Sequence, residues 1–181
     1  MSSSPSSRSN GTRWLARSGL AIALVTLGTL VLRFPMPQTE GYVNVGDTFI
    51  FVLAAEFGPL LGALAGGLGS ALADLLAGYP HWAPWTLVIK AVEGALAGWL
   101  LRVGAVRTPA VKAARPPLTI PRFVFACVMA GLWMVIGYSL AETLLYSWPA
   151  AIASLPGNLI QAGVSLLLAL PLTVALRHLR G

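Results

Sequence analysis

The sequence predicts an all-α, polytopic membrane protein with six transmembrane helices, and three observations lead to this fold class. The 181 residues are 56% hydrophobic and only 10% charged, with a mean hydropathy of +0.76. Long apolar runs hold almost no charge, and most of the cations lie between them. Backbone groups in lipid must hydrogen-bond internally, as they do in helices. The clearest runs are Leu20–Leu32, Leu60–Leu76 and Val164–Leu176.

Charge and cysteine content exclude several classes of function. The formal net charge of +6 does not come from a basic stripe, so we expect no nucleic-acid partner. Cys127 is the one cysteine and lies inside an apolar run, which rules out a disulfide framework or a cysteine-based metal site within the chain. We therefore expect neither a metal nor a cofactor.

The N-terminal segment, residues 1–13, is rich in serine and too polar to bury its own surface, so we predict a disordered cytoplasmic tail. Residues 14–181 then form the six-helix transmembrane domain. Ser18–Leu32 resembles the core of a signal peptide, but Arg33-Phe34-Pro35 follows where small residues would precede a cleavage site. We predict an uncleaved first helix.

Glycine, proline and polar breakers divide the remaining sequence into six spans. The second span is too short to cross lipid alone. It either extends back into Tyr42–Gly46 or lies against protein. The predicted spans are Trp14–Leu32, Asp47–Phe57, Pro59–Ala77, Thr86–Leu101, Phe123–Tyr146 and Pro156–Leu176.

The connections predict the orientation, because Lys and Arg collect in cytoplasmic loops. The N-terminal tail, the fourth connection and the C-terminus are basic, whereas Gly78–Trp85 and Ser147–Leu155 contain no Asp, Glu, Lys or Arg. With six spans, the three basic segments share one side of the membrane. We predict a multi-pass protein of the plasma membrane with both termini in the cytoplasm.

Polar residues within the spans gather in the outer third of the membrane. Ionisable groups in lipid are costly and usually face a bundle interior or a cavity, so this clustering predicts a site for a small polar molecule. Glu56, at the inner end of the second span, stands apart. The outer residues are Asp47, Asp74, Lys90, Glu93, Glu142, Asn158 and Gln161.

Each polar residue also has a structural interpretation. Asp47 follows Gly46 and could simply cap a helix. Asp74 and Lys90 reach similar depths on consecutive antiparallel helices, and we favour a structural ion pair for them. Glu93 lies three positions after Lys90 and could join that pair or face a ligand. We favour ligand contact for Glu93, Asn158 and Gln161.

The outer connections add aromatic rings. Tyr79–Trp85 contains three aromatic residues and His81, a density beyond that of ordinary interfacial anchors. Rings beside buried carboxylates suit a flat polar heterocycle, including a cationic one.

Small residues recur every four positions in the third span, from Gly58 through Gly62 and Gly66 to Ser70, which predicts close helix packing. No phosphate-binding loop, zinc-protease motif or nucleophile elbow occurs in the sequence. We therefore do not expect an enzyme.

Four stretches carry a resemblance to a known family: Gly41–Asp47, Gly58-Pro59, Asp74–Pro84 and Thr86–Lys90. Over about residues 41–98 the chain resembles the substrate-binding S component of energy-coupling factor (ECF) vitamin transporters. The resemblance is closest to the branch with riboflavin-type and hydroxymethylpyrimidine-type S components.

The resemblance implies a subunit that binds a small water-soluble vitamin or precursor from outside. It also implies association with a membrane T component and two cytoplasmic ATPases. In this family the T component contacts small residues four apart in the first helix, and the nearest form here is Gly19 with Ala23. The implied pocket residues are Glu93, Glu142, Tyr146, Asn158 and Gln161, with Tyr42, Asn44 and Trp82 in the capping loops.

Two other hypotheses stay open at this point. The chain could be a self-sufficient permease, proton-coupled through Asp74, Lys90 and Glu93, or it could be a membrane scaffold. No residue pattern selects riboflavin over a pyrimidine or pyridine vitamin.

Overall fold

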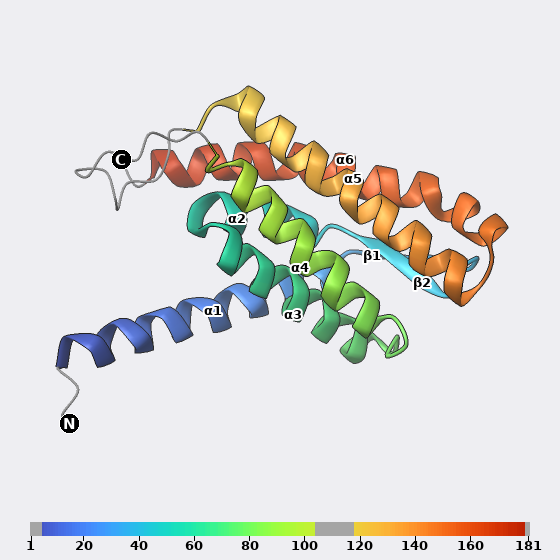
Figure 1. The fold of residues 1–181 in the computed structure, drawn as a ribbon, viewed down its shortest axis with the longest axis horizontal. Helices are drawn as coiled ribbons and strands as arrows, with labels where there is room; N and C mark the ends of the chain where they lie inside the picture. Colours follow the sequence, from blue (N-terminus) through green and yellow to red (C-terminus); the bar gives the residue numbers. More distant parts are fainter. Residues whose placement is uncertain (1–4, 104–117, 180–181) are drawn as a thin grey trace.

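The computed structural model describes residues 5–103 and 118–179, which form six helices and one β-hairpin. Helix α1 begins and α6 ends at one end of the bundle, and the hairpin lies toward the other end (Figure 1). The elements in chain order are α1 (Pro5–Val31), β1 (Arg33–Met36), β2 (Gly41–Asn44), α2 (Asp47–Phe57), α3 (Pro59–Ala77), α4 (Ala83–Leu100), α5 (Ile120–Leu145) and α6 (Trp148–His178).

Four of these helices are long and apolar enough to cross a membrane: α1 over Gly11–Val31, α3, α5 and α6. Helix α4 carries Lys90 and Glu93 within its 18 residues. Helix α2 has 11 residues, about 16 Å at 1.5 Å per residue, well short of the hydrocarbon thickness. The described residues therefore form a polytopic helical membrane protein. Helices α2 and α4 are not long and apolar enough to cross a membrane alone, so they depend on packing against their neighbours.

The second span does not extend back into Tyr42–Gly46, as one of our two expectations held. Strand β2 occupies Gly41–Asn44 instead, and α2 begins at Asp47. Almost every side chain of α2 is buried, because the helix packs against α3, α4 and α6. The short helix lies against protein, which was the other expectation.

The hairpin is the element that an all-α prediction missed. Strands β1 and β2 pair antiparallel, with Arg33 opposite Asn44 and Met36 opposite Gly41. Glu40 turns the chain with a φ of 45°. These strands have four residues each, too few to give a recognisable alternation of polar and apolar residues.

Several helices begin earlier than predicted, and proline explains most of these differences. Pro84, Pro121 and Pro149 lie in the first turns of α4, α5 and α6, where the missing N–H would be unpaired in any case. Pro156, the predicted start of the sixth span, lies inside α6. Ser147 caps that helix by accepting a hydrogen bond from the Ala150 N–H at 3.3 Å.

The first helix also begins earlier, at Pro5 rather than Trp14. Residues 5–13 are therefore helical, which differs from the disordered tail that their serine content predicted. Once the apolar segment has formed a helix, each further turn needs little additional stabilisation, because helix propagation is much easier than nucleation.

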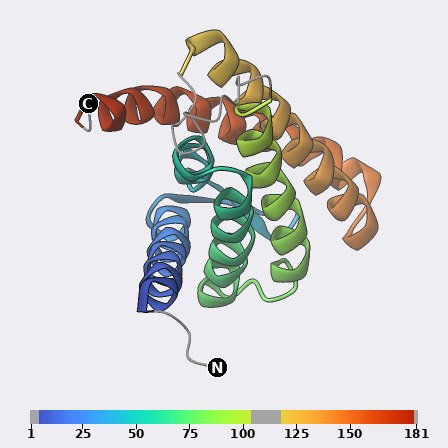
Figure 2. The ribbon, with the colours of Figure 1, turned by 60° about the vertical axis from the view of Figure 1, so that its left-hand side comes forward.

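Helices α3 and α4 approach closely along a stripe of glycines, as the four-residue spacing predicted (Figure 2). A Cβ atom on Gly62 would lie 2.6 Å from the carbonyl oxygen of Gly94, and one on Gly66 would lie 2.5 Å from that of Lys90. This contact fixes where the polar residues of α4 lie relative to α3.

We expect Gly94→Ala to destabilise the protein by about 1–3 kcal/mol, the usual cost of overpacking. The new methyl group would overlap the Gly62 carbonyl oxygen. The midpoint of thermal unfolding in detergent measures the effect. Gly163→Ala in α6 is the matched control, since a Cβ there meets nothing within 4 Å. An unfolding midpoint for Gly94→Ala equal to that of the control would contradict the close contact.

Candidate functional site

A pocket lies among the hairpin, α1, α3, α4, α5 and α6, near the end of α1 and the beginning of α4. Its wall combines hydroxyl, amide and charged groups with aromatic rings. The lining residues are Thr29, Met36, Thr39, Gly41, Tyr42, Asn44, Ser70, Asp74, Trp82, Thr86, Lys90, Tyr138, Glu142, Asn158 and Gln161.

The space inside this pocket is small. The volume open to the centres of water molecules is about 30 Å³, which is room for about two waters. A vitamin-sized molecule therefore enters only if the lining moves. The hairpin is held to the bundle mainly by side-chain contacts, so it is the part of the wall best able to do so.

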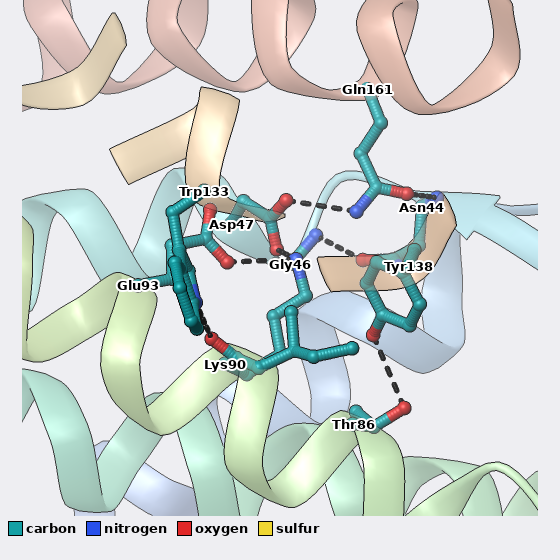
Figure 3. Close-up of polar contacts among 10 residues, drawn as sticks. Asn44, Gly46, Asp47, Thr86, Lys90, Glu93, Trp133, Tyr138 and Gln161 are labelled. Carbon is teal, nitrogen blue, oxygen red and sulfur yellow. Dashed lines mark hydrogen bonds and ion pairs between the residues drawn. The ribbon is translucent and has the colours of Figure 1, made fainter. Parts of the chain in front are cut away.

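Lys90 lines the pocket and forms ion pairs with two carboxylates. Its Nζ lies 2.5 Å from Asp47 Oδ1 and 2.9 Å from Glu93 Oε2, and the three side chains are at most 1% exposed. The second Asp47 oxygen, Oδ2, accepts a hydrogen bond from Gln161 Nε2 at 2.8 Å (Figure 3). One cation thus joins α4 to the first turn of α2, and α6 completes the contact.

The predicted ion pair between Asp74 and Lys90 is wrong. Lys90 instead binds Asp47 in the first turn of α2. Asp47 also does not act as the predicted cap, because it is the first residue of α2 and makes no capping bond. Its two oxygens bind Lys90 and Gln161 instead.

Three hydrogen bonds fasten the hairpin and its turn over the pocket. The Tyr42 hydroxyl donates to Asp74 Oδ1 at 2.6 Å, and the Asn44 N–H donates to Gln161 Oε1 at 2.8 Å. Trp82 Nε1 donates to the Thr39 carbonyl at 3.2 Å. Burial and the Asp74 carboxylate raise the pKa of the Tyr42 hydroxyl, so the hydroxyl stays protonated and donates.

A second polar group forms where α5 meets α6. Ser154 donates a hydrogen bond to Glu142 Oε2. Asn158 Nδ2 lies 3.4 Å from Glu142 Oε1, a long contact. All three side chains are buried, which places a carboxylate and an amide side by side on the pocket wall.

Aromatic rings form the remaining wall. Trp82 meets Tyr138 edge-on at 5.9 Å between centroids, and the Tyr138 hydroxyl donates to Thr86 Oγ1 at 3.1 Å. Tyr42 packs against Tyr79 at 5.2 Å. These rings lie beside Asp74 and Lys90, so the pocket offers both stacking surfaces and charged groups.

Most of the predicted pocket residues line the pocket, but Glu93 and Tyr146 do not. Glu93 lies behind Lys90. Tyr146 lies outside Trp82, with its hydroxyl 3.1 Å from His81 Nε2. The residues that line the pocket as predicted are Tyr42, Asn44, Trp82, Glu142, Asn158 and Gln161, joined by Asp74 and Lys90, which we had assigned to structure.

Sequence reasoning missed Tyr138 and Thr86, which line the pocket. A signal for both existed in the helical spacing. Tyr138 precedes Glu142 by four positions, and Thr86 precedes Lys90 by four, so each pair shares a helix face. The missed Thr29 lies near the end of α1, in the run Leu20–Leu32 that contains no charged residue.

Nearly the whole chain matches a known protein family. Residues 9–178 match the family described as ECF-type riboflavin transporter, S component. The chain belongs to this family. It is therefore a substrate-binding S component of the ECF type, which is a membrane subunit and not an enzyme.

Individual relatives are similar to this S component over most of its length. An uncharacterised protein of Pyrococcus woesei is 39% identical over 76% of this chain and 84% of its own length. The thiamine precursor transporter HmpT of Lactococcus lactis is 28% identical over 82% of this chain and 80% of its own length. A solved S component of a bacterial ECF transporter shares the fold, with a TM-score of 0.63 at 17% identity, covering 93% of this chain and 98% of its own.

We expect Lys90→Met to destabilise this S component by about 3–5 kcal/mol, because it leaves Asp47 and Glu93 buried without their cation. The measurement is the midpoint of thermal unfolding in detergent. Adding Asp47→Asn and Glu93→Gln to the same chain removes the unpaired charges and should restore most of the loss. Equal stability of wild type and Lys90→Met would show that the ion pairs contribute little.

Proposed function

We propose that this chain captures a water-soluble vitamin or vitamin precursor at the outer face of the plasma membrane. The observation that carries the proposal is the pocket beneath the hairpin, where Asp74, Glu142 and Asn158 lie among aromatic rings. Buried polar groups of this density inside a membrane bundle are costly and indicate a binding site. Trp82 and Tyr138 supply flat apolar surface for a ring.

The orientation rests on the distribution of cations. We place both termini in the cytoplasm. We also assign all six helices to the membrane domain, with α2 and α4 enclosed by the others. Arg102, Arg122 and Arg177 lie at the end of the bundle opposite the pocket, as the positive-inside rule requires. The predicted cytoplasmic cations Arg107, Lys112 and Arg115 lie outside the described residues.

Energy for uptake would come from partner subunits. The family assignment supports a T component and two ATPases as those partners. Gly19 and Ala23 are exposed on α1, and a Cβ on Gly19 would meet nothing within 4 Å. This open strip of small side chains suits close approach by a partner helix.

We propose an aromatic heterocycle as the cargo, and the names of the family and of one relative support this proposal. The family description names riboflavin, and the HmpT relative is named for a thiamine precursor. Both the isoalloxazine ring and a pyrimidine ring would stack on rings such as those of Trp82 and Tyr138.

We expect tryptophan fluorescence of the purified chain to change saturably with one of riboflavin, thiamine, its pyrimidine precursor or pyridoxine. Trp82 is buried at the pocket and should report binding. Asn158→Ala should weaken that binding about tenfold, the effect of losing one buried hydrogen bond, with the unfolding midpoint unchanged. No change in the fluorescence of folded protein with any of these compounds would argue against vitamin capture.

We expect the double substitution Gly19→Leu and Ala23→Leu to reduce vitamin uptake by cells that contain the partner subunits. Binding to the purified chain should not change, since these residues lie on the outside of α1. Gly163→Leu, on an exposed and open face of α6, is the matched control. Normal vitamin uptake by the α1 variant would show that the partner subunit does not contact Gly19 and Ala23.

A further inference from the structure

We propose that Asp74 is a direct ligand contact and that this pocket selects amine-bearing heterocycles while excluding cargo with an acidic group. This inference rests on the proposed function, because it names the chemical class of cargo for the same pocket. It also replaces the structural role that the sequence suggested for Asp74.

One oxygen of Asp74 has no direct hydrogen bond within the described residues, although the Thr86 hydroxyl also interacts with this carboxylate. Its Oδ1 accepts the Tyr42 hydroxyl at 2.6 Å, whereas its Oδ2 is buried and has no hydrogen-bond partner in the described part of the chain. The residue is 5% exposed and lines the pocket. Buried carboxylate oxygens are nearly always hydrogen-bonded, since an unpaired one is costly. An N–H group of a ligand would satisfy Oδ2.

The pocket has little positive charge to offer an anion. Lys90 is the cation among the described lining residues, and it is already bound to two carboxylates, Asp47 and Glu93. Arg33 lies over the Tyr42 ring at 5.7 Å and is not part of the lining. A phosphate or carboxylate inside the pocket would therefore meet Asp74 and Glu142 without a free cation to neutralise it.

The part of the pocket lining where α5 meets α6 complements an amino heterocycle. Glu142 and Asn158 place a carboxylate oxygen beside an amide, with their polar atoms 3.4 Å apart. An exocyclic amine next to a ring nitrogen offers a donor beside an acceptor, which matches a carboxylate beside an amide N–H. The rings of Tyr138 and Trp82 also line the pocket and would hold the heterocycle flat.

The first test compares neutral compounds with their acidic counterparts by tryptophan fluorescence of the full chain. The pairs are a hydroxymethyl aminopyrimidine and its phosphate ester, riboflavin and its phosphate, and nicotinamide and nicotinic acid. We expect an amine-bearing neutral member to bind, and its acidic counterpart to bind about a hundredfold more weakly. Equal or tighter binding of the acidic member would overturn the inference while leaving vitamin capture intact. Absence of binding by every compound would overturn the proposed function itself.

The second test assigns the selectivity to Asp74. Asp74→Asn should weaken binding of the amine-bearing compound about ten- to a hundredfold. It should also reduce the ratio of the affinity for the neutral member to the affinity for its acidic counterpart. Tyr42→Phe removes the hydrogen bond between the hairpin and Asp74 but keeps the Asp74 carboxylate. The affinity for the amine-bearing compound should therefore fall less, and the ratio of neutral to acidic affinities should stay as in wild type. An unchanged ratio in Asp74→Asn, or an equally narrowed ratio in Tyr42→Phe, would show that Asp74 acts only by holding the hairpin.

Discussion

The bonds of the buried Lys90 ammonium hold this structure together. It bonds to Asp47 on α2 and to Glu93 on its own helix, and Gln161 of α6 binds the other Asp47 oxygen. The carbonyl of the same Gln161 side chain accepts the N–H of Asn44 in the hairpin. Because a buried charge without its partner is strongly destabilising, α2, α4, α6 and the hairpin must meet in one register.

Packing and polar contacts act in different halves of the bundle. Toward the ends marked by Gly58 and Gly98, α3 and α4 touch backbone to backbone, because glycines leave no side chain between them. Farther along the same helix faces, Ser70 and Asp74 replace glycine, and the space between the helices opens into the pocket. A close contact that widens in this way places the pocket between the glycine-packed end of the two helices and the hairpin.

The bounds of α2 and α3 agree with the prediction, because Gly46, Gly58-Pro59 and Gly78 are clear breakers. The depth of each polar residue was also predictable, which explains why so many candidates line one pocket. The direction in which each side chain points around its helix was not. Lys90 could therefore be assigned the wrong carboxylate. The uncharged Tyr138 and Thr86 could be found only from their four-residue spacing to Glu142 and Lys90. The short hairpin strands had no periodicity to detect.

The brevity of α2 has a consequence for the biosynthesis of the protein. A helix of 11 residues cannot settle across the bilayer as it leaves the ribosome, and its first residue is the acidic Asp47. Lys90, which neutralises this carboxylate, and Gln161, which donates a hydrogen bond to it, are synthesised later, and Gln161 belongs to the last helix. Helix α2 thus takes its final place only after α6 has been made, so folding of this subunit finishes after translation of its membrane segments is complete.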